Sequence, residues 1–209
     1  MKQKQEYLWK LWSVLSLVLI ALAVIGLRVF WHPEPHFKGV YWNAPSFSYE
    51  ERSGRTVQSS ELQGHYWVAD FIFTRCAGSC PVMSEQMSRL QTEWKGDPRL
   101  QLVTFTVDPQ YDTAAVLRDY ADDLHADPHQ WLFLTGDKKN LLKTATEGFK
   151  LDALENPNGT PGAQFIHSTY LVLVGPNGKI LDFYDGTDET EFKQLRVDLK
   201  TLLGERKIS

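Results

Sequence analysis

The chain has 209 residues, of which 43% are hydrophobic and 23% charged, a composition typical of a globular protein. Its formal net charge is −4 and it has no large basic block, which argues against nucleic-acid binding, a function that requires a basic face. With only two cysteines, Cys76 and Cys80, it is not a disulfide-stapled scaffold. The pair is interpreted as a chemical site, with a local structural disulfide or two buried thiols as the alternative.

The amino-terminal segment predicts a membrane anchor. Residues 1–10 are rich in lysine and residues 11–27 carry no charge. We expect 1–10 to be cytoplasmic and 11–31 to form one transmembrane helix. A cleaved signal peptide, with residues 21–23 as the cleavage site, is the alternative. Both place the rest of the chain outside the cytoplasm. The lack of an Arg- and Ser-rich presequence favours a bacterial plasma membrane with a periplasmic domain over a mitochondrial inner membrane.

The remaining elements are predicted in chain order, after a Pro-containing linker over 32–46. Strand 66–73 is apolar except for Asp70 and precedes the cysteine pair. Alternating strands and helices predict a mixed α/β sheet with helices on both faces, an elaborated thioredoxin-like domain over 47–209. The elements expected are a hairpin over 47–60, strands over 66–73, 100–107, 131–134, 168–174 and 179–184, helices starting at Pro81 and after Asp112–Thr113, helices over 138–148 and 187–203, and a loop over 152–163.

The two cysteines are four positions apart, where a strand ends and a helix begins. On one helical turn they would share a face, and a helix amino terminus lowers the pKa of a thiol. Two thiolates are soft ligands suited to Cu(I), zinc or a cluster. His167, at the start of an apolar strand, is a candidate third ligand, with a hydrogen-bonded structural histidine as the alternative. Asp108 is a candidate outer-shell partner or oxygen ligand, with a helix cap as the alternative.

Two other groups of metal-binding residue types are interpreted as structural. His125 and His129 lie beside aspartates, but the intervening Asp127-Pro128 breaks any helix between them, so we expect a solvated loop. Met83 and Met87 follow the helical period and are expected to pack in the core.

The motifs resemble those of the Sco/SenC family. Residues 71–81, FIFTRCAGSCP, resemble its Cys-x-x-x-Cys-Pro signature, and 107–120, VDPQYDTAAVLRDY, resemble its Val-Asp-Pro block. WLFLTG over 131–136 and HSTYLVLVGPNG over 167–178 match in order and approximate spacing. The resemblance covers about residues 45–203. It departs between the cysteines, where many members have a proline and this chain has Ala-Gly-Ser.

This resemblance implies an anchored thioredoxin-like domain that binds copper through Cys76, Cys80 and His167. It implies a role in assembling the CuA centre of cytochrome c oxidase, as copper donor, thiol reductant or both. The implied partners are the CuA-bearing oxidase subunit and other copper chaperones or thioredoxin-like reductants. The alternatives are a thiol–disulfide oxidoreductase without a copper role, a peroxiredoxin-like enzyme, for which Thr74-Arg75 is a poor match, and a binding module with a structural disulfide.

Overall fold

The computed structural model describes residue 12 and residues 15–23, 41–156, 162–163 and 165–204. The chain divides into two compact units, 1–35 and 36–209. In the first, Trp12 and residues 15–23 are helical. No helix in the described part of the chain has both the length and the apolar character needed to cross a bilayer. Residues 1–10, predicted to be cytoplasmic, most of the predicted span 11–31 and the predicted linker up to residue 40 lie outside the described residues, so the anchor stays a prediction.

One seven-stranded mixed sheet organises the second unit, in the order β2-β1-β5-β4-β3-β8-β9. The three inner strands β3, β4 and β5 run parallel, and the outer strands pair antiparallel. The parallel strands are almost entirely buried, which explains their near-continuous apolar sequences. The strands are β1 (Ser48–Glu51), β2 (Thr56–Gln58), β3 (Tyr66–Ile72), β4 (Leu100–Thr106), β5 (Trp131–Thr135), β8 (Tyr170–Val174) and β9 (Ile180–Asp185).

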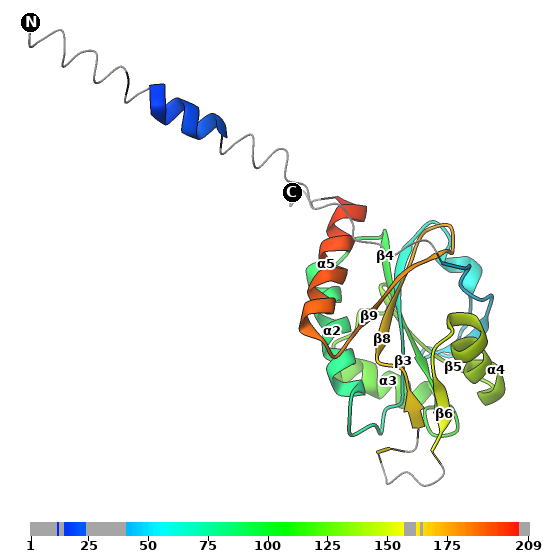
Figure 1. Ribbon diagram of the computed structural model, residues 1–209. Helices are drawn as coiled ribbons and strands as arrows, with labels where there is room; N and C mark the ends of the chain where they lie inside the picture. The colour runs from blue at the N-terminus through cyan, green and yellow to red at the C-terminus, as the bar shows by residue number, and fades with distance from the viewer. Residues whose placement is uncertain (1–11, 13–14, 24–40, 157–161, 164, 205–209) are drawn as a thin grey trace, which may run out of the picture. The chain divides into compact units, whose positions relative to one another are not determined.

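Helices cover both faces of the sheet, as predicted (Figure 1). Helices α2 (Cys80–Glu93), α3 (Ala114–Asp123) and α5 (Glu189–Leu203) pack on one face. A short 3-10 helix (Ser59–Leu62), α4 (Lys138–Lys143) and the π-helical turn that continues it (Thr144–Phe149) pack on the other. Met83 and Met87 lie on the face of α2 that packs in the core and are fully buried, which confirms their packing role. The mixed sheet with flanking helices is therefore confirmed.

The sequence prediction differs from the structure around residue 160. The loop expected over 152–163 contains a strand, β6 (Ala153–Glu155), which pairs antiparallel with β7 (Phe165–His167) in a separate two-stranded sheet. The strand expected over 168–174 begins at Tyr170, so His167 ends β7 instead of starting β8. Strands of three residues are too short to give a periodic signal, and the Pro and Gly residues between them indicated a loop.

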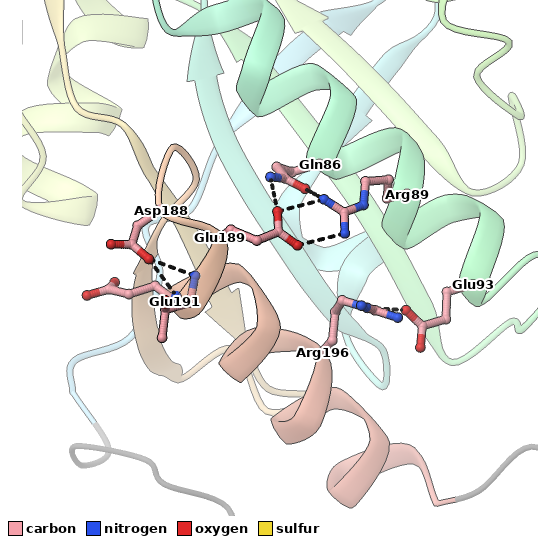
Figure 2. Close-up of polar contacts among 8 residues, drawn as sticks. Gln86, Arg89, Glu93, Asp188, Glu189, Glu191 and Arg196 are labelled. Carbon is pink, nitrogen blue, oxygen red and sulfur yellow. Dashed lines mark hydrogen bonds and ion pairs between the residues drawn. The ribbon is translucent and has the colours of Figure 1, made fainter.

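Polar contacts tie α2 to α5 along their exposed sides (Figure 2). Arg89 donates two hydrogen bonds, both 2.8 Å long, to the two carboxylate oxygens of Glu189, and Gln86 donates a third to the same carboxylate. One turn further along, Arg196 is paired with Glu93. Water screens the exposed Arg89–Glu189 pair, so the buried leucines of the two helices carry the packing.

Residues 41–44 extend the sheet edge beside β9. The backbone N–H of Tyr41 donates to the Ile180 carbonyl at 3.0 Å, and the indole N–H of Trp42 donates to the Gly148 carbonyl at 2.6 Å. This segment therefore connects the edge strand to the end of the π-helical turn. From Gly148 the chain continues through buried Phe149 and Leu151 into β6.

Candidate metal centre

The two cysteines lie where β3 ends and α2 begins. Cys76 belongs to the connecting loop, and Cys80 is the first residue of α2. Pro81 follows in the first turn of the helix, where a backbone N–H would have no partner within the helix, so proline costs no hydrogen bond there. The two thiols therefore do not lie on one helical turn. The loop still brings them together, and both thiols are free. Cys80 is 1% exposed, whereas Cys76 is partly exposed and accepts a weak hydrogen bond from the Gly78 N–H at 3.4 Å.

The β6–β7 hairpin places His167 beside the two cysteines. Its Nε2 lies 3.1 Å from the Cys80 Sγ. The ligand atoms of Cys76, Cys80 and His167 all lie within 4.8 Å of one another, and no other such group of His, Cys, Asp or Glu occurs among the described residues. The Phe73 ring packs edge-on against the imidazole, with ring centroids 5.7 Å apart. The structure thus brings the three predicted residues together.

The His167 ring is oriented for its Nε2 to act as a ligand. Nδ1 lies 3.0 Å from the Ser168 carbonyl oxygen. A carbonyl oxygen only accepts hydrogen bonds, so Nδ1 carries the proton and Nε2 presents its lone pair to Cys80. Burial lowers the pKa of His167, against the opposing effect of the Ser168 hydrogen bond, and so favours this neutral form. A neutral imidazole held by its second nitrogen is the form that binds metals.

Burial gives Cys80 a high thiol pKa, contrary to the expectation from the helix amino terminus. Desolvation is the largest cause, a hydrogen bond with the Phe73 backbone partly opposes it, and Cys76 and the Asp70 carboxyl group raise the pKa further. Without a metal, Cys80 is therefore a neutral thiol whose S–H can point at His167 Nε2. A cation at this point would replace that proton and hold the two sulfurs as thiolates.

Asp108 lies outside this cluster. Its carboxylate is 5% exposed and pairs with Arg75 at 2.7 Å, while the helix that follows is capped by Thr113. Arg75 also stacks over the Tyr111 ring, 3.9 Å from its centroid. Asp108 therefore contacts the cysteine loop through the residue that precedes Cys76. His125 and His129 are exposed at the end of α3 and in the loop after it, as expected for a solvated segment.

Asp112, two residues before α3, anchors the cysteine loop through hydrogen bonds. It is fully buried and accepts hydrogen bonds from the Thr74 N–H, the Thr74 hydroxyl and the Thr106 hydroxyl. This network joins the turn before Cys76 to the end of β4. Local sequence could not show this role, because two of the donors belong to Thr74, in the turn after β3, and the third to Thr106 at the end of β4.

Replacing Asp112 is expected to destabilise the domain. In Asp112→Ala one buried and two partly buried donors lose their acceptor, and the free energy of unfolding should fall by about 3 kcal/mol. Urea denaturation of the wild type and the variant measures this change. Asp119→Ala, on the exposed side of α3, is the control and should change stability by less than about 0.5 kcal/mol. Equal losses in both variants would contradict the anchoring role.

Comparison with known proteins gives the family. The SCO1/SenC family model matches residues 41–203. The SCO1 protein homolog of Bacillus subtilis is 33% identical over 157 residues, which cover 74% of this chain and 80% of that protein.

Two solved structures share the fold. BsSco, described as a member of the Sco family of cytochrome c oxidase assembly proteins with a disulfide switch, is 29% identical, with a TM-score of 0.69 over 81% of this chain and 98% of that one. Yeast Sco1 with copper bound is 23% identical, with a TM-score of 0.62 over 80% and 92% of the two chains, and so shows the fold alone. The thioredoxin-like mixed sheet predicted from the sequence is thereby confirmed. On the family model and the Bacillus subtilis relative together, the chain belongs to the SCO1/SenC family.

Proposed function

We propose that this chain binds copper through Cys76, Cys80 and His167 and assists assembly of the CuA centre of cytochrome c oxidase. The observation that carries the proposal is the convergence of two thiols and one correctly oriented imidazole within 4.8 Å. Two sulfurs and one nitrogen form a soft donor set suited to Cu(I), and an added oxygen ligand would accommodate Cu(II). Structural zinc would require a fourth protein ligand. The assembly role described for BsSco supports this choice.

Copper is cargo in this proposal, and the chain's own groups control its release. On loading, the Cys80 thiol gives up its proton, so bound metal is exchanged for protons at the sulfur. The partly exposed Cys76 is the sulfur that an incoming partner can reach, while Cys80 is buried. The proposed partners are the CuA-bearing oxidase subunit and other copper chaperones or thioredoxin-like reductants. The lysine-rich start and the apolar segment over 11–31 support a plasma-membrane anchor with a periplasmic domain.

A thiol–disulfide exchange role at the same site is the second candidate. Cys76 is accessible, Cys80 is buried beside it, and both are free, which is the arrangement a resolving pair of thiols needs. In such a step the Cys76 thiolate would attack a partner disulfide and expel one partner thiolate. Cys80 would then attack the mixed disulfide, leaving a Cys76–Cys80 disulfide and a fully reduced partner.

Copper titration of the reduced protein tests the proposal. We expect one Cu(I) or one Cu(II) ion per chain, with a sulfur-to-copper charge-transfer band for Cu(II). His167→Ala should abolish that band, because the imidazole is needed to hold the oxidised ion, while His129→Ala, an exposed histidine, should leave it unchanged. A protein that binds no copper but reduces a partner disulfide catalytically would contradict the metal-carrying role and support the exchange role.

A further inference from the structure

The β6–β7 hairpin touches the cysteine loop at a second point, away from the metal ligands. The backbone N–H of Ala77 donates to the carbonyl oxygen of Gly162 at 3.1 Å. Gly162 belongs to the connection between β6 and β7, and Ala77 directly follows Cys76. One backbone hydrogen bond therefore joins the part of the chain that carries the thiols to the part that carries the histidine.

Gly162 comes unusually close to that loop. A Cβ atom at this position would lie 2.8 Å from the Ala77 Cβ, 3.2 Å from the Ala77 nitrogen and 3.3 Å from the Arg75 carbonyl oxygen. Two of these three atoms are backbone, which cannot move aside as a flexible side chain would. Only glycine fits here without displacing one segment from the other.

Two other glycines have a similar backbone conformation but no close neighbour, so they serve as controls for the effect of conformation alone. Gly162 has a φ of +90°, and Gly64 and Gly178 have φ values of +86° and +75°. A Cβ at Gly64 or Gly178 would have nothing within 4 Å. Alanine at any of the three carries a similar backbone strain, but only at position 162 does it also push against another segment. The chain thus contains its own matched controls.

We propose that Gly162 is a positioning residue, which sets the separation between the cysteine loop and the histidine hairpin and so the geometry of the metal site. Cys80 and His167 are 87 residues apart in sequence, and their side chains meet at 3.1 Å. β7 forms no part of the seven-stranded sheet, so no strand pairing of that sheet holds His167 itself. The Ala77–Gly162 hydrogen bond and the packing of Phe73 against Phe165 and His167 set the distance. The consequence for copper rests on the proposed function.

The test compares Gly162→Ala with Gly64→Ala in the full chain. Hydrogen exchange of the Ala77 amide should accelerate at least about tenfold in Gly162→Ala, because opening the contact exposes that N–H to water. Cu(II) binding should weaken at least about tenfold, with a lower charge-transfer intensity, because imidazole and sulfurs no longer meet at one ion. Gly64→Ala should leave both readouts at wild-type values. Wild-type exchange and copper binding in Gly162→Ala, or equal changes in Gly64→Ala, would overturn the proposal.

Two further variants change Ala77, the residue of the cysteine loop that contacts Gly162. Ala77→Gly combined with Gly162→Ala removes the 2.8 Å contact and should recover part of the amide protection and of the Cu(II) band. Ala77→Val enlarges the side chain at an exposed loop position and should reproduce the Gly162→Ala changes. It tests the contact even if Gly162→Ala itself folds poorly. Failure of both predictions would contradict a role for this contact.

The two proposals fail in different ways. If the wild type binds no copper, the proposed function is wrong, and the Ala77 exchange rates still decide whether Gly162 joins the two segments. If Gly162→Ala exposes the Ala77 amide but binds copper like the wild type, the positioning role is wrong and the copper proposal stands.

Discussion

A Cys80→Ser variant is expected to bind copper more than about a hundredfold more weakly than the wild type. Loss of an outer-shell partner alone costs about 10- to 100-fold in metal affinity, and Cys80 is itself a proposed ligand. The substitution also removes the Sγ that lies 3.1 Å from His167 Nε2, which leaves Cys76 as the one sulfur of the proposed site. Serine is a hard oxygen donor that a soft ion such as Cu(I) binds poorly.

Competition titration with a Cu(I) chelator measures this loss. Ser79→Ala is the matched control, since Ser79 is the neighbouring residue and its side chain makes no capping hydrogen bond to α2. That variant should keep wild-type affinity. Near-ultraviolet circular dichroism of the metal-free variants checks that the fold is retained. Tight Cu(I) binding by a folded Cys80→Ser protein would rule out Cys80 as a ligand.

Replacing Asp70 is expected to change how stability depends on pH. Asp70 is completely buried in the middle of β3 and its carboxylate oxygens have no hydrogen-bond partner among the described residues, so burial raises its pKa from 3.8 to about 7. Between about pH 4 and pH 7 the folded protein keeps a proton that the unfolded chain has released. Stability therefore falls as pH rises through this window, by up to about 1.4 kcal/mol per pH unit and by roughly 4 kcal/mol in all.

Asp70→Asn removes this titration. Its stability should vary much less between pH 4.5 and pH 8, and it should exceed that of the wild type at pH 8, because no charge has to form in the core. Urea denaturation across this pH range, with Asp119→Asn as the exposed control, gives the comparison. Parallel pH profiles for the wild type and Asp70→Asn would show that Asp70 does not titrate in this window.

Local sequence signals predicted the sheet better than they predicted the site. The apolar strands and the cysteine loop at the end of β3 followed from hydrophobic patterns and from Pro81. His167 could be joined to the cysteines only through the family resemblance, because its place depends on two three-residue strands that leave no periodic signal. The direction of the Cys80 pKa was wrong because desolvation, which needs the tertiary structure, outweighed the helix amino terminus. The predicted membrane span stays a prediction.

The separate two-stranded sheet has a consequence for how such a site can change. The two cysteines follow directly after β3 of the seven-stranded sheet, in which any shift in strand register would disturb many buried side chains. The imidazole sits on an appendage whose strands share no ladder with that core. A different donor at the end of β7, away from the Gly162 contact, would therefore leave the packing of β3 and α2 intact. In the proposed metal site the core fixes the two sulfurs, and a substitution at position 167 would change the third donor while both cysteines stay in place.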